Sequence, residues 1–325
     1  MDTSSLWPYP SPNQSSGSTN SDSPHRDAPS SGSGEQTGFT TPAVHTPPDD
    51  ATISIAFNPS FRVDDLLPDS IIISSNHVYF YVHRHRILNI SSNAFLGQFL
   101  HGGPSITGLL LSVHIPEGGD VANVLLHTMY GLSCLHFYPS LETVDRSLEA
   151  MKKYGVSIAA HATPQYPLYH LILSHAPHRP VETYALAGHY GLEDLAITIS
   201  SHLLSYDTSR LTDDIVTKMG PVYLKRLFLL HQSRLHALRD ILLQPPASHP
   251  ATPGCADDER AKLTRAWALA TARMVWDATP SISTATLRTY LEPIGESITC
   301  ESCRDMLLQR IQDVVNSWTL VKATI

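Results

Sequence analysis

The sequence predicts an α+β protein, in which a small sheet flanked by helices is followed by an all-helical region. Apolar residues alternate with a period of two between residues 71 and 82, as in paired strands. They recur with a helical period over residues 121–129 and 141–151. From residue 224 onward only helical patterns occur, apart from a Pro-rich break at 245–254.

The predicted sheet begins with a pair of strands joined by a tight turn. Three consecutive isoleucines at 71–73 favour a strand because they are β-branched. Ser74-Ser75-Asn76 supplies turn residues, and apolar side chains at 78, 80 and 82 alternate behind it. A third strand is predicted at 109–116.

A helix is predicted to follow the second strand, because Ile87, Leu88, Phe95 and Phe99 suit one helical face. We expect Phe80, Leu88, Phe95 and Leu125 to be buried together. Two more helices are predicted, one that ends at Tyr130-Gly131 and one that ends at Lys152-Lys153-Tyr154-Gly155.

This order of elements resembles the BTB/POZ domain. That family has a strand that ends in Phe-x-x-His, followed by a Leu…Ser…Phe helix. The corresponding residues in this chain are Phe80, His83, Leu88, Ser92 and Phe95. The phrase Tyr-Gly-Leu-Glu-Asp at 190–194 is similar to fungal, basidiomycete-like members. The resemblance covers Pro68 to about residue 175.

The resemblance implies a non-enzymatic protein–protein interaction module that acts as an adaptor or scaffold. It further implies self-association, recruitment of a cullin-type ubiquitin ligase through the helix pair at 121–154, or binding of a transcriptional partner. Many BTB domains dimerise through a lead-in helix. Asn58-Pro59 interrupts such a helix here, so we expect only weak self-association.

Composition divides the chain into five segments. Residues 1–50 are rich in Ser and Pro and are expected to form a disordered tail. A BTB/POZ-like domain is expected at 51–175 and a helical extension at 176–244. A Pro-rich linker at 245–254 then leads to a C-terminal helical segment at 255–325.

Charge and hydropathy exclude several classes of function. The 325 residues carry a net charge of −8, which gives no basic surface for nucleic acid. The sequence contains no run of 18 apolar residues, so no membrane span is expected. The first residues lack the charged start and apolar stretch of a signal peptide. With only four cysteines, the chain is expected to be intracellular, in the cytoplasm, the nucleus or both.

One group of residues has a spacing typical of metal sites. Cys300 and Cys303 form a Cys-x-x-Cys pair, and Cys255 with the nearby His249 could complete a Cys3His zinc site. A complete zinc signal has two such pairs, so a buried pair of packed thiols is the favoured interpretation. No cofactor is therefore expected, with zinc as the one candidate. A redox role for the Cys-x-x-Cys pair is not expected, because no thioredoxin-like βαβ pattern surrounds it.

No catalytic residue is predicted. The sequence contains neither a nucleophile elbow nor a phosphate-binding glycine loop. The paired carboxylates Asp64-Asp65, Asp213-Asp214 and Asp257-Asp258 are interpreted as caps of exposed amides. The alternative is a metal-dependent or hydrolytic enzyme that uses some of the 18 histidines or the cysteines.

Overall fold

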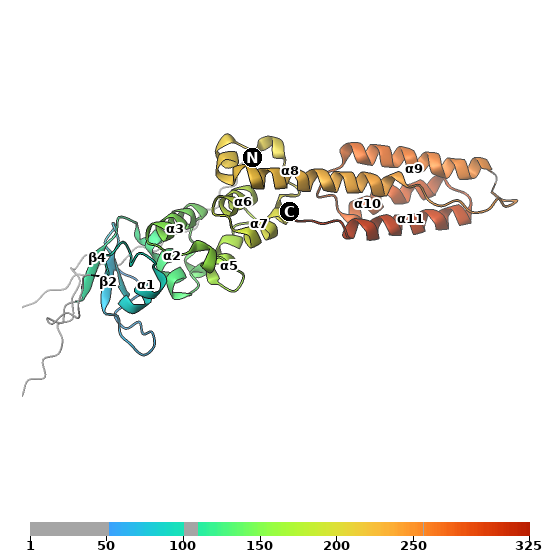
Figure 1. The fold of residues 1–325 in the computed structure, drawn as a ribbon. Helices are drawn as coiled ribbons and strands as arrows, with labels where there is room; N and C mark the ends of the chain where they lie inside the picture. Colours follow the sequence, from blue (N-terminus) through green and yellow to red (C-terminus); the bar gives the residue numbers. More distant parts are fainter. Residues whose placement is uncertain (1–51, 101–109, 256) are drawn as a thin grey trace, which may run out of the picture. The chain divides into compact units, whose positions relative to one another are not determined.

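The computed structural model describes residues 52–100, 110–255 and 257–325. By its internal contacts the chain divides into Met1–Pro42 and Ala43–Ile325, and all described residues belong to the second unit. The tail predicted at 1–50 lies outside the described residues. Within them the protein is α+β, with a small mixed sheet and many helices (Figure 1).

Four strands form the sheet in the described part of the chain: β1 (Thr52–Ile53), β2 (Ser70–Ile73), β3 (Val78–Val82) and β4 (Leu111–His114). Their order is β1-β3-β2-β4. β2 and β3 are antiparallel, with Ile72 opposite Phe80, whereas β4 runs parallel to β2. The hairpin and the third predicted strand are thus present, and β1 adds a short parallel edge beside β3.

The helix predicted after β3 is shorter than expected. α1 (Arg84–Ile90) ends where Ser91 and Asn93 offer their side chains to the backbone. Ser91 Oγ accepts from the Phe95 amide at 2.6 Å, and Asn93 Oδ1 accepts from the Leu96 amide. Residues 94–97 all have left-handed φ values. The prediction of one helix from Ile87 to Phe99 was therefore wrong, because local polar side chains replace the helical hydrogen bonds.

The next helices follow the predicted periods. α2 (Gly119–Tyr130) ends at Gly131, which has a φ of +68°. The short η1 (Leu135–Phe137) leads to α3 (Leu141–Lys153). Ser140 caps α3 by accepting from the Thr143 amide, and two lysines occupy its last turn.

Several short helices connect α3 to the long helix of the protein. They are α4 (Ile158–His161), α5 (Pro167–Leu173), α6 (Pro180–His189), α7 (Glu193–Ser200), η2 (Ser201–Leu203) and η3 (Thr208–Arg210). Gly191 has a φ of +65° between α6 and α7, as the Tyr-Gly-Leu phrase predicts. α8 (Asp213–Leu243) is kinked at Gly220, just before Pro221.

The C-terminal helices pack against the second part of α8 (Figure 1). They are α9 (Asp257–Asp277), α10 (Thr284–Leu291), η4 (Glu292–Ser297) and α11 (Glu301–Thr319). The buried Arg234 of α8 ties the end of the chain to this group. Its guanidinium donates to the carbonyls of Pro280, Val321 and Lys322 at 2.7–2.9 Å.

Two main cores hold these elements together. The first core consists of buried side chains from Phe57 to Leu227 and includes Phe80, Phe95 and Leu125. Leu88, predicted to be buried with them, is only half-buried, because Ile87 occupies the inward position on α1. The second core draws on the end of α8, Cys255 and the C-terminal helices: Leu238, Leu242, Cys255, Leu263, Trp267, Met274, Leu287, Leu291, Ile294, Ile298, Cys303, Leu307, Ile311, Val314 and Trp318.

The sheet is apolar on both faces. Ile72, Phe80 and Val82 point into the first core, while Ile71, Ile73 and Tyr81 form a separate small cluster on the opposite face. Among the helices that the structure describes, none is long and apolar enough to cross a membrane.

Candidate metal centre

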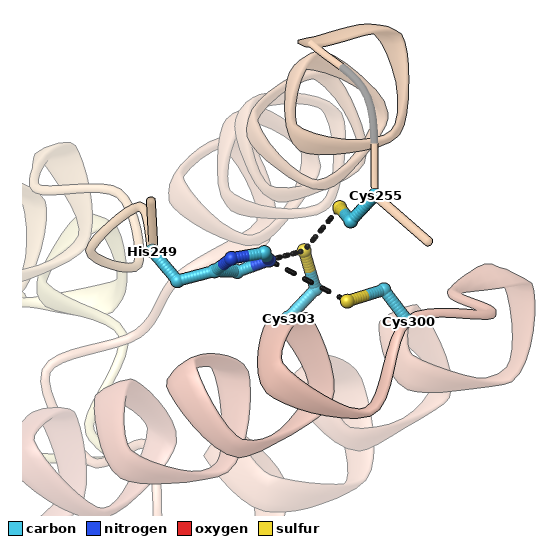
Figure 2. A group of neighbouring side chains, drawn as sticks. All are labelled: His249, Cys255, Cys300 and Cys303. Carbon is cyan, nitrogen blue, oxygen red and sulfur yellow. Dashed lines mark hydrogen bonds between the residues drawn. The ribbon is translucent and has the colours of Figure 1, made fainter. Parts of the chain in front are cut away.

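The four residues singled out as metal candidates in the sequence lie together in the structure. The donor atoms of His249, Cys255, Cys300 and Cys303 are all within 4.8 Å of one another (Figure 2). His249 and Cys255 belong to the connection between α8 and α9, whereas the Cys-x-x-Cys pair opens α11. The cluster therefore joins two segments that are far apart in the sequence.

The start of α11 places two sulfurs on one side. Cys300 is the residue before the helix, and Cys303 lies in its first turn. Side chains three positions apart share a helical face, so both sulfurs point toward the α8–α9 connection. Cys303 is buried and Cys300 is half-buried.

A tight turn presents the third sulfur. The amide of Cys255 donates to the Thr252 carbonyl at 3.0 Å, and Pro253 and Gly254 lie between them. The turn directs the buried Cys255 at Cys303, with 3.7 Å between the two sulfurs. The Pro and Gly residues of this linker thus have a positioning role.

The imidazole of His249 is oriented by its own backbone. Its Nδ1 lies 2.7 Å from the Pro250 carbonyl, which can only accept, so Nδ1 carries the proton. The lone pair is therefore on Nε2, which lies 3.2 Å from Cys303 Sγ and 3.4 Å from Cys300 Sγ (Figure 2). Arg260 donates to the His249 carbonyl at 3.1 Å and fixes this stretch of backbone.

The three thiols differ in acidity. Burial raises the pKa of Cys303 to about 12 and also raises the pKa of Cys255. The backbone amide of Cys303 at the start of α11 stabilises a thiolate on Cys300 and lowers its pKa to about 7. The cluster combines soft sulfur donors with one neutral imidazole, which is a donor set for zinc and similar ions.

The paired carboxylates lie in first turns of helices or in a turn, but the cap of α8 is Thr212, whose hydroxyl accepts from the Ile215 amide. Asp213-Asp214 and Asp257-Asp258 lie in the first turns of α8 and α9, next to the positive ends of the helix dipoles. Asp64-Asp65 forms a turn with left-handed φ values. None of these pairs belongs to the one His/Cys/Asp/Glu cluster found among the described residues.

A second feature was not identified in the sequence. The segment between α2 and α3 exposes Leu132, Leu135, Phe137 and Tyr138, and we call these four residues the α2–α3 patch. Tyr138 is 89% exposed. Beside the patch lies an open hollow of about 500 Å³, which reaches Leu171 and His175. The sequence did contain a signal for this patch: four large apolar or aromatic residues lie within the seven positions 132–138, between two predicted helices.

Comparison of the chain with protein-family models, with curated proteins and with solved structures finds no match.

Proposed function

We propose that the chain is a non-enzymatic protein–protein interaction module of the BTB/POZ type, which acts as an adaptor or scaffold. The observation that carries the proposal is the path of the chain through the sheet. An antiparallel hairpin is followed by α1, and β4 then returns parallel to the first strand of the hairpin. The packed pair α2 and α3 comes next. This is the order of elements implied by the sequence resemblance.

The residues that carry the resemblance serve the scaffold. His83 is buried, and its Nε2 donates to the Leu66 carbonyl at 3.1 Å. Its Nδ1 is then free to accept from the hydroxyl of Tyr130, which in turn accepts from the His83 amide at 2.7 Å. This network connects the end of β3 to α2 and to Leu66, in the segment that precedes β2. His83 therefore has a structural role in this part of the chain.

The α2–α3 patch is the surface that fits a protein partner best. Aromatic residues are enriched at the centres of interfaces, and a hollow beside them can receive a partner side chain. The patch lies within the helix pair at 121–154, which the family resemblance associates with a cullin-type ligase. A partner with an apolar anchor residue matches this surface.

The rival function, a metal-dependent or hydrolytic enzyme, finds less support in the geometry of the His/Cys cluster. A catalytic zinc keeps one coordination position open for water or substrate. Here four protein donors surround one point, and two of the three sulfurs are buried. Such a donor set closes a tetrahedral site and favours a structural role.

The proposal is tested by quantitative affinity capture with the full chain and two variants. Tyr138→Asp changes the α2–α3 patch, and Trp276→Asp changes an equally exposed aromatic residue on α9. Binding of a purified cullin is measured in parallel. Loss of a central aromatic anchor costs 2 kcal/mol or more, so we expect roughly 30-fold weaker binding for Tyr138→Asp alone. Partners that bind both variants like the wild type would refute the assigned surface, and no specific partner at all would refute the function.

A further inference from the structure

We propose that His249, Cys255, Cys300 and Cys303 bind one zinc ion, as a closed structural centre that fastens the α8–α9 connection to the start of α11. This inference goes beyond the proposed protein-binding function and does not depend on it. It rests on the separations of the donor atoms, on the orientation of the imidazole and on the types of the four ligand atoms.

The separations match those of a tetrahedral ion. With Zn–S near 2.3 Å and Zn–N near 2.0–2.1 Å, tetrahedral geometry places two sulfurs about 3.8 Å apart and a sulfur and a nitrogen about 3.6 Å apart. The sulfurs of Cys255 and Cys303 are 3.7 Å apart. His249 Nε2 lies 3.2 and 3.4 Å from the two sulfurs of the Cys-x-x-Cys pair. The two N–S distances are 0.2–0.4 Å shorter than the tetrahedral value and every pair of donor atoms lies within 4.8 Å, so side-chain shifts of up to about 1 Å would complete a coordination shell.

The imidazole is already in the form that a metal requires. The Pro250 carbonyl holds the proton on Nδ1, so the Nε2 lone pair faces the centre of the cluster (Figure 2). Metal-binding histidines commonly donate their second nitrogen to a carbonyl or carboxylate in this way. Arg260 holds the same backbone from the other side.

A cluster of packed thiols, the interpretation favoured from the sequence, is compatible with the same contacts. Nε2 has one lone pair within 3.4 Å of the sulfurs of both Cys300 and Cys303, and the sulfurs of Cys255 and Cys303 can serve each other as donor or acceptor. What favours an ion is that four ligand atoms of the types zinc prefers all lie within 4.8 Å of one another. A zinc ion receives an electron pair from each of the three thiolates and from the imidazole, and the thiol protons are released to solvent.

The ion would act as a cross-link within the second core. Cys255 and Cys303 both belong to that core, next to the helices that carry Trp267 and Trp318. The Pro-rich connection has no regular hydrogen-bonded structure of its own between α8 and the turn at Thr252. Coordination of the ion would hold this connection against α11 in place of hydrophobic packing.

The test measures zinc bound to the reduced full chain after gel filtration, by elemental mass spectrometry. We expect one zinc per chain. Changes to outer partners of a zinc site weaken binding by roughly 10–100-fold, so loss of a ligand in Cys303→Ser should cost more than about tenfold in affinity. Cys134→Ser is the matched control, because Cys134 is a buried cysteine of the first core. It should retain one zinc.

Two measurements on the wild-type chain guard against a variant that does not fold. Co²⁺ should give the intense visible bands of a tetrahedral ion together with thiolate charge-transfer absorption. Zinc should protect three of the four thiols from a thiol reagent, and a chelator should expose them and change the emission of Trp267 and Trp318. Absence of zinc uptake, an octahedral Co²⁺ spectrum or equal thiol reactivity with and without zinc would each overturn the proposal. Zinc fully retained by Cys303→Ser would also overturn it.

Discussion

The rings of Phe95 and Tyr154 stack in parallel, with centroids 3.9 Å apart and planes 8° from each other. Phe95 lies in the left-handed turn after α1, and Tyr154 is the residue at which α3 ends. The Tyr154 hydroxyl donates to Glu117 at 2.5 Å. This pair therefore fixes an irregular turn against the end of α3 and the segment after β4.

Phe95→Ala should destabilise the first core by about 3–5 kcal/mol, the usual cost of removing a buried aromatic side chain. Urea denaturation followed by far-UV circular dichroism measures the loss. Leu96→Ala, at the exposed neighbouring position, is the control and should change stability little. A loss below about 1 kcal/mol for Phe95→Ala would show that the ring is not part of the core.

Substitution of two glycines distinguishes the cost of backbone strain from the cost of a steric clash. Gly131 and Gly155 both have φ near +70°, but a Cβ on Gly131 would meet no atom within 4 Å. A Cβ on Gly155 would lie 2.8 Å from the backbone nitrogen of Asn93. Gly131→Ala should cost about 1–2 kcal/mol from the left-handed conformation alone. Gly155→Ala should cost clearly more in the same thermal denaturation assay, and equal losses would contradict the close approach of Asn93.

Arg234→Met should weaken the attachment of the chain end to α8. The change removes the donor to the partly buried carbonyls of Pro280, Val321 and Lys322, and losing hydrogen bonds from a charged donor costs about 1–3 kcal/mol. Arg239→Met, an exposed position on the same helix, is the control and should be nearly neutral. Arg234→Lys should not restore full stability, because one ammonium cannot reproduce the planar fork. Complete rescue by lysine would contradict this role.

Stability should fall as the pH drops below neutrality. Burial lowers the pKa of His127 from 6.5, and the pKa values of His175 and His231 are lowered for the same reason. The contribution of each histidine to folding stability is complete above its pKa in the unfolded chain, 6.5. It is lost as the pH falls toward the lower pKa in the folded protein, because the unfolded chain binds the proton first. The slope is at most about 1.4 kcal/mol per pH unit for each group.

Denaturation between pH 7.5 and 5.5 measures this slope. His127→Gln should make it shallower, since the amide does not titrate in this range and can still donate to the Asn123 carbonyl that His127 contacts. The control is His202→Gln at an exposed position, which should keep the wild-type slope. An unchanged slope in His127→Gln would show that His127 does not contribute.

Self-association should be weak. The residues around Asn58-Pro59 form turns, and no helix is assigned anywhere in the described stretch 52–83. The lead-in helix that the sequence resemblance associates with dimerisation is therefore missing from this described stretch. Analytical ultracentrifugation of the full chain should show a monomer or a weak dimer at micromolar concentration. A dimer that persists at nanomolar concentration would contradict this prediction.

Periodic segments were predictable from the sequence, and segments fixed by side-chain hydrogen bonds were not. The faces of α2 and α3 follow from apolar spacing, and Gly131 and Gly191 mark helix ends through their left-handed conformations. The turn at 94–97 depends on hydrogen bonds from Ser91 and Asn93 that no spacing rule contains.

Residues 213–219 at the start of α8 also escaped prediction; Gly220 has a non-helical conformation and separates them from the helix that continues from Pro221. The candidate metal residues could be named by type and spacing. The convergence of the four side chains could not be derived from the sequence. His249 lies in a linker, where no periodic pattern indicates the direction of a side chain.

One stretch of α8 contributes side chains to both cores. Leu227 belongs to the first core and Leu238 to the second. At 3.6 residues per turn, eleven positions complete slightly more than three whole turns, so the two leucines lie within about 20° of each other around the helix axis. A single inserted or deleted residue between them would rotate one apolar face by about 100° relative to the other. A substitution along this stretch changes individual contacts and leaves the two faces in register, whereas a change in its length would put the two cores out of phase at once.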